Sequence, residues 1–282
     1  MKTILIPAED HDAMPAVLEA ARLIAQQFES YMEGFAVRPS FGTYVTVEPV
    51  SGIAISGAFE ADTAKQVRAE FETFMQSHGV ARAAAGDGLA RYSYDWPRDE
   101  PAEDEFIGRR GRVFDLIVLG KPGPEPQNPR MAALEAALFE SGRPVLIVPP
   151  SVPQSIGRNV LVAWNDSTEQ AHTNAFAIPL LQRADKVTVL TVEGGTASAA
   201  SCERAALHLR RNGVNATALL IKSGARYSGE ATGEVILAQA AKLGCDLVVK
   251  SAYTQSRLRQ MIFGGATRRI LGNATLPVFM AH

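Results

Sequence analysis

Residues 3–10 read TILIPAED, and residues 159–166 read NVLVAWND. Both stretches are short apolar runs that end in an acid or an amide. Apolar runs of this length, bounded by polar residues, are typical of buried strands. Their recurrence at two distant positions indicates that the chain contains an internal repeat, which decides the fold more than any single element does.

Two further pairs of runs recur in the same order. Residues 115–119 (DLIVL) match residues 246–250 (DLVVK), and residues 144–148 (PVLIV) match residues 277–281 (PVFMA). The offset between the copies falls from 156 residues at the first run to 133 at the last, so the first copy carries about 23 extra residues. The chain therefore consists of two copies of one pattern, the first of them longer.

Helical patterns separate the strand-like runs. The apolar positions at helical spacing are Val17, Ala21, Ile24 and Phe28, then Ala64, Val67, Phe71 and Phe74, in the first copy, and Cys202, Ala206 and Leu209, then Ile236, Ala240 and Leu243, in the second. Gly79, Gly213 and Gly244 follow three of these patterns, where glycine commonly ends a helix. Strands that alternate with helices predict parallel sheets with right-handed crossovers.

The predicted fold class is therefore α/β, Rossmann-like, with two tandem, mostly parallel, five-stranded sheets that have helices on both faces. We expect domains at residues 1–150 and 157–282, joined by a stiff linker because PPSVPQSIG, residues 149–157, holds three prolines and a glycine. Residues 38–57 are rich in glycine and proline and are expected to form an irregular excursion. Residues 83–112 show little periodicity before Phe106.

Composition excludes several classes of protein. The 28 Lys and Arg residues against 30 Asp and Glu give a net charge near −2, which argues against a nucleic-acid binder. No apolar run reaches the roughly 18 residues that a membrane helix needs. Two cysteines cannot build a disulfide framework, and the N-terminus turns acidic by residue 9 without a signal-peptide pattern. These features predict a cytoplasmic protein with no membrane segment.

The loop after the fourth strand of the second copy is the best candidate for chemistry. It runs KSAYTQSRLRQMIFGGATRR from residue 250 to residue 269. Its glycine pair, Gly264 and Gly265, precedes a helix-like segment, where backbone N–H groups and the helix dipole favour a phosphate. Positive charge is nearby at Arg257, Arg259, Arg268 and Arg269. The alternative is a tight turn beside a solvated basic surface.

With this loop the chain resembles the universal stress protein family over its whole length, as two tandem copies of which the second is closer. The family's nucleotide signature is Gly-x2-Gly-x9-Gly-Ser/Thr after the fourth strand, and its register falls on Ser251, Thr254, Gly264 and Gly265, of which only Gly264 is the expected residue. The resemblance implies an adenine nucleotide hydrolase-like fold and, as ligand, ATP or AMP with Mg²⁺. The implied binding residues are Ala163, Asn165, Val192, Lys250, Ser251, Thr254, Gly264, Gly265 and Ala266.

The departures from the signature weaken the loop. Side chains at 251 and 254 resist the positive φ that glycine allows, and Gly265 lacks a hydroxyl donor. Asn165 stands where the family has an acid, a mild change because an amide can still donate and accept. We expect Ser167 to cap the next helix, and we favour a core role for Trp164 over a wall of a base pocket.

The first copy departs further from the signature. Gly120-Lys-Pro-Gly123 keeps the first two glycines, but prolines and Glu125 follow, and no glycine arrives at the later position. Prolines remove N–H donors, and a carboxylate would repel phosphate. The first copy is therefore predicted to bind no nucleotide and to serve a structural or partner-binding role.

Other chemistry has little support. His11, His78, His172, His208 and His282 are scattered without metal-ligand spacing, which favours surface or helix-face roles. Cys202 and Cys245 fit small core residues, and neither a nucleophile elbow nor a P-loop is present. Glu9, Asp10 and Asp12 suggest a carboxylate cluster, although Asp12 fits better as the cap of the first helix.

The combined prediction is a tandem universal stress protein, packed as an intramolecular pseudo-dimer, or a homodimer, in which Val145–Val148 pairs with Val278–Ala281. Three functions stay open. The first is a non-enzymatic stress-response protein that signals through adenine nucleotide and protein partners. The second is a slow ATP hydrolase or nucleotidyl-transferring enzyme, and the third is a nucleotide-free scaffold. The first is favoured, because no carboxylate or lysine forms a convincing catalytic group beside the glycine pair.

Overall fold

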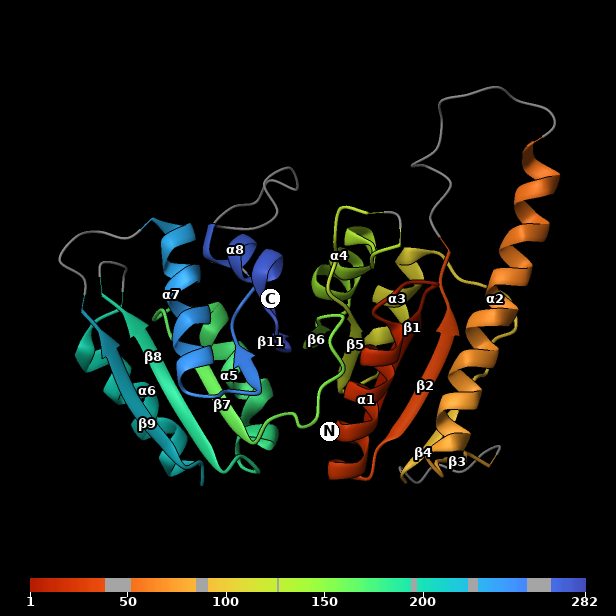
Figure 1. Cartoon of the computed structure of the whole chain (residues 1–282). Coiled ribbons are helices and arrows are strands. Elements are labelled where there is room, and N and C mark those ends of the chain that lie inside the picture. Colours follow the sequence, from red (N-terminus) through yellow and green to blue (C-terminus); the bar gives the residue numbers. More distant parts are fainter. Residues whose placement is uncertain (39–51, 85–90, 126, 194–196, 223–227, 253–264) are drawn as a thin grey trace. The chain divides into compact units, whose positions relative to one another are not determined.

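The computed structural model describes residues 1–38, 52–84, 91–125, 127–193, 197–222, 228–252 and 265–282, and its contacts divide the chain into Met1–Arg143 and Pro144–His282 (Figure 1). We call these the first and the second unit. Each unit contains one copy of the strand and helix pattern that the sequence predicts. None of the helices in the described ranges is long and apolar enough to span a bilayer.

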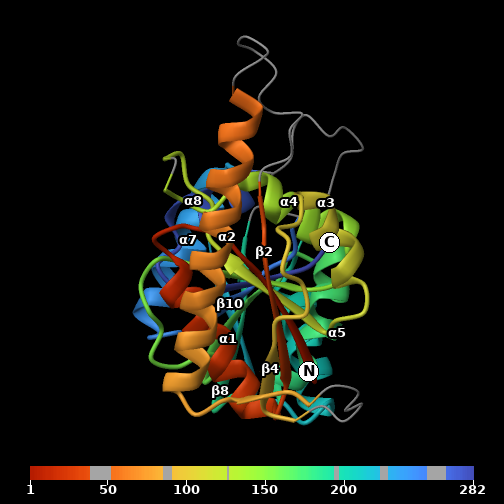
Figure 2. The ribbon, with the colours of Figure 1, turned by 90° about the vertical axis from the view of Figure 1, so that its right-hand side faces the viewer.

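In its described residues, the first unit forms a five-stranded parallel sheet with four helices. Its elements are β1 (Thr3–Ala8), α1 (Met14–Phe28), β2 (Tyr31–Ala36), α2 (Gly52–Ser77), β3 (Ala81–Arg82), β4 (Ser93–Asp95), α3 (Asp104–Gly111), β5 (Leu116–Gly120) and α4 (Met131–Glu140). The strand order is β3-β4-β2-β1-β5, and every pair is parallel. The long α2 packs on β2 and β1 and lies in the foreground of Figure 2. Helix α3 packs against α4.

The elements of the second unit are β6 (Val145–Val148), β7 (Asn159–Ala163), α5 (Thr168–Leu181), β8 (Lys186–Val192), α6 (Ala199–Arg211), β9 (Ala216–Ile221), α7 (Gly229–Lys242), β10 (Leu247–Val249), α8 (Gly265–Asn273) and β11 (Val278–Met280). The strand order is β6-β11-β10-β7-β8-β9. The second unit thus shares the central part of the order of the first unit, because β8-β7-β10 corresponds to β2-β1-β5.

Strand β6 is the exception to the parallel arrangement. It runs antiparallel to β11, with Val278 opposite Ile147 and Met280 opposite Val145. The predicted pairing of these two segments is confirmed, and the predicted α/β class is also confirmed. The expected count of five strands is wrong for the second unit, because β6 is the last run of the first copy in sequence but pairs with β11 and belongs to the second unit.

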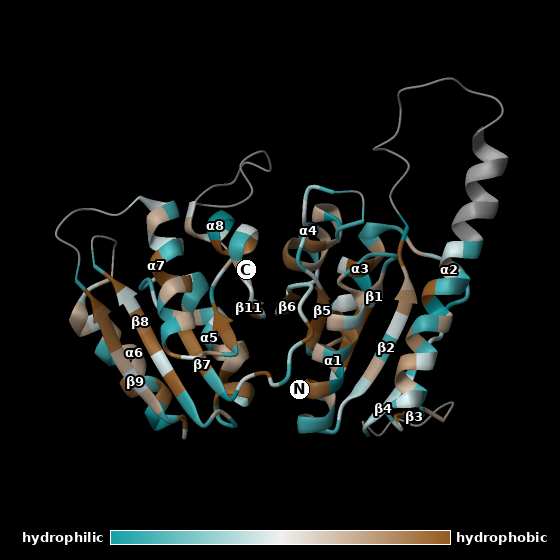
Figure 3. Cartoon of the chain, in the orientation of Figure 1, coloured by the Kyte–Doolittle hydropathy of each residue, from teal (hydrophilic) through white to brown (hydrophobic). Residues whose placement is uncertain are grey.

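Continuous apolar runs place the strands in the core of each unit. The central strands β1, β5, β7 and β10 are buried except for the first residue of β1 and of β7, as expected for parallel strands covered on both faces, and β5 and β7 are mostly brown in Figure 3. The predicted helix faces are buried too, for example Val17, Ala21 and Ile24. Gly79, Gly213 and Gly244 end their helices with φ of 66°, 79° and 63°, which confirms the helix ends drawn from the sequence.

The predicted irregular excursion at residues 38–57 is wrong in part. Helix α2 begins at Gly52 and therefore includes residues 52–57, whereas residues 39–51 lie outside the described ranges. Glycine costs only about 1 kcal/mol in a helix, and the good helix formers around Gly57 outweigh it. The weakly periodic stretch 83–112 likewise contains β4 and α3, held by Trp96, which is 2% exposed and packs on Phe71.

The predicted cap of the first helix is also wrong. The N-cap of α1 is Ala13, no side chain caps it, and Met14 N donates to His11 O at 3.0 Å. Pro15 lies in the first turn of the helix, where its fixed φ suits helical backbone and its missing N–H costs nothing. The start of α1 therefore needs no carboxylate, and Asp12 N instead donates to Gln127 O.

Candidate functional site

The carboxyl ends of β7 and β10 meet in the second unit. These strands are parallel neighbours, with Val162 opposite Val249, so the residues that follow them emerge at the same edge of the sheet. From β7 the chain continues to β8, which is the neighbour of β7 on one side, whereas β10 is its neighbour on the other side. In open α/β sheets such a switch point is where ligands bind. Asn165 follows β7, and Lys250 and Ser251 follow β10.

Asn165 shapes the turn that starts α5. Its Oδ1 accepts hydrogen bonds from Ser167 N at 3.2 Å and from Ser167 Oγ at 2.8 Å. Ser167 Oγ in turn accepts from Gln170 N at 3.1 Å, which confirms Ser167 as the N-cap. Between them, Asp166 has a φ of 61°, a conformation that aspartate tolerates better than most residues. The site is therefore anchored to a rigid helix start.

A buried polar cluster joins α5 to the end of β10. Ser251 N donates to Gln170 Oε1 at 2.8 Å, and Gln170 Nε2 donates to Asn174 Oδ1 at 2.9 Å. All three residues are buried. Gln170 and Asn174 were not predicted from the sequence, although their i, i+4 spacing on a helix that packs on the sheet was a signal. The cluster fixes Ser251 by its backbone, so its side chain is presented at a defined place.

Lys250 is the most unusual residue of the site. It is 6% exposed, and its Nζ donates to Ser251 O at 3.1 Å and lies 3.5 Å from Ser251 Oγ. Within the described ranges, no carboxylate lies within ion-pair distance of this ammonium. Burial lowers the pKa of Lys250 to about 8, and the more distant charge of Glu169 opposes that shift. A buried ammonium without a counter-ion is costly, and such groups occur mostly at functional positions.

Trp164 is not the core residue that the sequence analysis favoured. It is half-buried at the end of β7, and its Nε1 donates to Ser201 Oγ of α6 at 2.8 Å. Ala163, one residue earlier, is buried, and Val192 is half-buried at the end of the neighbouring β8. These three residues form an apolar edge beside Asn165.

Gly265 starts α8, as the sequence predicts, but its contacts are with α7. A Cβ on Gly265 would lie 3.0 Å from Glu230 N and 3.1 Å from Gly229 C. Helix α7 has a second glycine, Gly233, whose Cβ would lie 2.8 Å from Ala266 O. The missing side chains thus let two helices pack closely. Close helix packing, in addition to any ligand, explains a glycine at position 265.

Part of the predicted basic surface is used inside the unit. Arg269 forms an ion pair with Glu234 of α7 at 2.5 Å. Thr254, Gly264, Arg257 and Arg259 lie outside the described residues.

The corresponding position in the first unit is filled by the chain itself. Glu9, the counterpart of Asn165, is 8% exposed and forms an ion pair with Arg130. Arg130 also forms an ion pair with the buried Asp104 of α3 at 2.7 Å. Burial raises the pKa of Glu9 in spite of Arg130. The predicted cluster of Glu9, Asp10 and Asp12 is therefore wrong, because Glu9 is joined through Arg130 to Asp104 of α3 instead.

His11 and the loop after β5 complete this arrangement. His11 is buried, contrary to the predicted surface role, and burial lowers its pKa. A Cβ on Gly120 would lie 2.4 Å from Pro129 Cγ and 3.1 Å from His11 Cε1. The proline-rich loop thus folds back over the ends of β1 and β5. The other four histidines are exposed.

The two cysteines differ. Cys202 is a core residue, as predicted, and its Sγ donates to Val189 O at 3.3 Å. Cys245 is only half-buried, so the predicted core role is wrong for it. It lies just before β10 and not within the strand. Burial and the neighbouring Asp246 raise the pKa of Cys245 to about 11, which keeps the thiol protonated and unreactive at neutral pH.

Comparison with known proteins agrees with this fold. Residues 157–282 match the model of the Universal stress protein family. No curated protein matches the sequence. A universal stress protein from Archaeoglobus fulgidus DSM 4304 is similar over 99% of this chain and 95% of its own, with a TM-score of 0.71 and 14% identity. Protein PA1789 of Pseudomonas aeruginosa PAO1, described as functionally unknown, covers 100% of this chain and 92% of its own, with a TM-score of 0.56 and 16% identity. At these identities the similarity establishes the fold.

Proposed function

Residues 157–282 form a domain of the universal stress protein family, and from this premise we propose that the protein is a stress-response binding protein whose second unit binds an adenine nucleotide, ATP or AMP. The proposed site lies at the carboxyl ends of β7 and β10. Asn165, Ala163 and Val192 would line the base and ribose. Lys250, Ser251 and the start of α8 at Gly265 and Ala266 would face the phosphates, with Mg²⁺ bound to the nucleotide.

The observation that carries this proposal is the buried ammonium of Lys250. It has only the carbonyl and hydroxyl of Ser251 as acceptors within the described residues. A phosphate would supply the missing negative charge in a place where little water screens it. A side-chain cation would also compensate for the glycines that positions 251 and 254 of the nucleotide signature lack.

We propose that the protein acts by binding and not by catalysis. The carboxylate whose charge acts on Lys250 is Glu169, which is not within ion-pair distance of it. A hydrogen bond from its own backbone N–H lowers the pKa of Glu169, and burial only partly opposes that shift, so Glu169 stays ionised and is a poor proton donor. Slow hydrolysis of ATP is the alternative, because Lys250 is close enough to neutrality to exchange protons near pH 8.

The test starts from the purified full chain. Denaturation followed by mass spectrometry should release an adenine nucleotide, and added Mg-ATP should raise the melting temperature. Lys250→Leu should abolish that rise, and it should fold, because the first unit has a buried leucine, Leu119, at the corresponding position. Lys186→Leu, at the exposed amino end of β8, removes the same charge and should leave the rise intact.

Each other outcome has a defined meaning. The absence of both a released nucleotide and a thermal shift would contradict nucleotide binding and favour the scaffold. AMP released after incubation with ATP would favour the enzyme. A thermal shift that persists in Lys250→Leu would place the nucleotide elsewhere.

A further inference from the structure

A pocket of about 570 Å³ lies in the first unit, and Arg130 is not among the residues that line it. It is lined by Arg38, Arg98, Pro101, Ala102, Glu103, Glu105, Phe106, Arg109 and Arg110. These residues follow β2, follow β4 and belong to α3, so the pocket lies at the carboxyl ends of β2 and β4. Small-molecule sites typically have about 300–1,000 Å³ and often lie at this end of an α/β sheet.

Main-chain bonds fix one wall of the pocket without any ligand. The segment after β4 is tied to the segment after β2, because Arg38 N donates to Ala102 O and Ala102 N donates to Ala36 O, both at 2.8 Å. Val37 and Ala102 form a parallel bridge at the same place. The wall is therefore an extension of the sheet.

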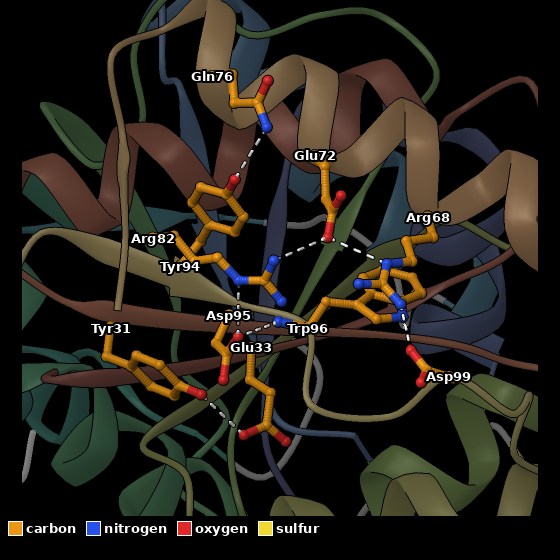
Figure 4. A network of polar contacts seen from close by, with 10 residues as sticks. All are labelled: Tyr31, Glu33, Arg68, Glu72, Gln76, Arg82, Tyr94, Asp95, Trp96 and Asp99. Atoms are coloured by element: carbon orange, nitrogen blue, oxygen red, sulfur yellow. Dashed lines mark hydrogen bonds and ion pairs between the residues drawn. The ribbon is translucent and has the colours of Figure 1, made fainter. Parts of the chain in front are cut away.

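A bidentate ion pair fixes the wall that α3 forms. Beside the pocket, the exposed Asp99 pairs with Arg68 of α2, which also contacts Glu72 (Figure 4). Helix α3 is held to β2 because Arg110 donates through Nε and Nη2 to the two oxygens of Glu33, each at 2.6 Å. Glu33 is almost fully buried, and Tyr31 Oη also donates to it (Figure 4). A pocket held in this way is preorganised for binding.

The lining carries more positive than negative charge. Four arginines face two glutamates, and two of the arginines have strong partners, Arg38 with Glu103 at 3.0 Å and Arg110 with Glu33. Among the described residues, no carboxylate lies within ion-pair distance of Arg109. Arg98 lies 3.8 Å from Glu100, whose side chain is 87% exposed and screened by water. Glu105, the second glutamate, is exposed.

An apolar wall lies beside these two arginines. The guanidinium of Arg98 is 5.3 Å from the centre of the Phe106 ring. Phe106 also forms a T-shaped contact with Phe35, with ring centres 5.1 Å apart. Pro101 adds a second apolar surface. The pocket therefore offers guanidinium donors and a fixed aromatic ring to the same occupant.

We propose that this pocket binds a small organic oxyanion, a phosphomonoester or a carboxylate with an apolar group. Arg98 and Arg109 bind the anion, because a guanidinium fork matches the paired oxygens of both anions. Phe106 and Pro101 contact the apolar group. The site belongs to the first unit and does not depend on nucleotide binding in the second.

Phenyl phosphate and benzoate are suitable probes, because each joins one anion to one ring and contains no adenine. Isothermal titration calorimetry of the full chain should show saturable binding of at least one of them, and the better probe identifies the anion. Arg109→Gln should lower that affinity at least tenfold, since a charge-assisted bond is lost. Arg109→Lys keeps the charge without the fork and should give an intermediate affinity. Arg91→Gln, an exposed arginine at the amino end of β4, is the matched control and should not change binding.

Two results would overturn the proposal. One is the absence of binding of either probe at about 10 mM, which corresponds to less than about 3 kcal/mol of binding free energy. The other is unchanged affinity in Arg109→Gln, which would place the probe in another site. Arg109 is exposed, so its loss leaves the core of the unit intact and a failure of binding is not a failure of folding.

Discussion

The two units use the same position, the end of the first strand of each copy, in opposite ways. In the first unit the acid Glu9 is neutralised by Arg130, from a loop that closes over the strand ends. In the second unit Asn165 has no charge to neutralise, and the buried cation Lys250 has no carboxylate within ion-pair distance among the described residues. One copy therefore satisfies its charges internally, while the other leaves a charge for a ligand.

The charged residues at these two positions should affect the stability of their units differently. A closed ion-pair cluster stabilises its unit only while all members are present, because each member is costly to bury alone. An uncompensated lysine destabilises its unit and is retained for another reason. Mutation of the two clusters should therefore change stability in opposite directions.

The largest effect is expected for Arg130→Ala. It leaves the carboxylates of Glu9 and Asp104 buried without their cation and should destabilise the first unit by about 3–5 kcal/mol. Urea denaturation can follow each unit separately, because the chain has two tryptophans, Trp96 in the first unit and Trp164 in the second. The Trp96 signal of a Trp164→Phe background should shift.

The same denaturation measurement on a control variant tests the prediction for Arg130→Ala. Arg158→Ala removes an exposed ion pair with Asp185 in the second unit and should cost less than about 1 kcal/mol. If Arg130→Ala were equally mild, Glu9 and Asp104 would be protonated or hydrated in the folded chain, and the first unit would not be closed by its own charges.

An effect of the opposite sign is expected for Lys250→Leu. In the wild type, the pKa of Lys250 is about 8, below the usual value of 10.5. Below pH 8 the folded state must bury the charge. Between about pH 8 and 10.5 only the unfolded chain stays protonated, so the stability of the wild type rises with pH over this window. At pH 7 Lys250→Leu should therefore be more stable by about 2–3 kcal/mol, with a smaller difference at pH 10.

Denaturation at pH 7, 8.5 and 10 checks this sign through the Trp164 signal. A wild type whose stability falls over the same window would mean that the ammonium has a partner that stabilises its charged form. In that case the charge of Lys250 would be compensated within the protein, as the charge of Glu9 is, and the two units would not differ in this respect.

The smallest effect is expected for Gly265→Ala. The added methyl group lies 3.0–3.2 Å from the backbone of α7, so the two helices must separate slightly. The cost of this overpacking, about 1–3 kcal/mol, is partly offset by the better helix propensity of alanine, which leaves about 1 kcal/mol of destabilisation. Gly272→Ala, where the Cβ meets nothing within 4 Å, should instead be neutral or stabilising. Equal behaviour of the two variants would rule out a packing role for Gly265.

The sequence predicted the elements better than the contacts. Repeated apolar runs and helix-ending glycines identify strands and helices because both are local and periodic. The cluster of Glu9, Asp104 and Arg130 was missed because its members are far apart in sequence and only the crossover through α3 brings them together. Asp12 was assigned as a cap from its residue type, whereas Pro15 sets the start of α1.

The candidate site was predictable in part. Ser251 and Gly265 follow from the register of the signature, and Asn165 and Lys250 follow from the wider resemblance to the family. The fold brings Asn165, Lys250 and Ser251 to one edge of the sheet. The burial of Lys250 was not predictable, since a single lysine after an apolar run is normally exposed. The arginine-lined pocket beside α3 was hidden in the weakly periodic stretch 83–112, where nothing in the pattern indicates which side chains converge.

The antiparallel pairing of β6 with β11 bears on how the protein can be divided. The family match starts at residue 157, after β6 has ended. A fragment cut at that point would lack the strand that hydrogen-bonds to β11 and would expose a row of unpaired main-chain groups from Val278 to Met280. Exposed edges of this kind recruit other chains. The segment that matches the family, residues 157–282, is thus shorter than the segment that keeps β11 paired. The longer segment has to begin upstream of Val145.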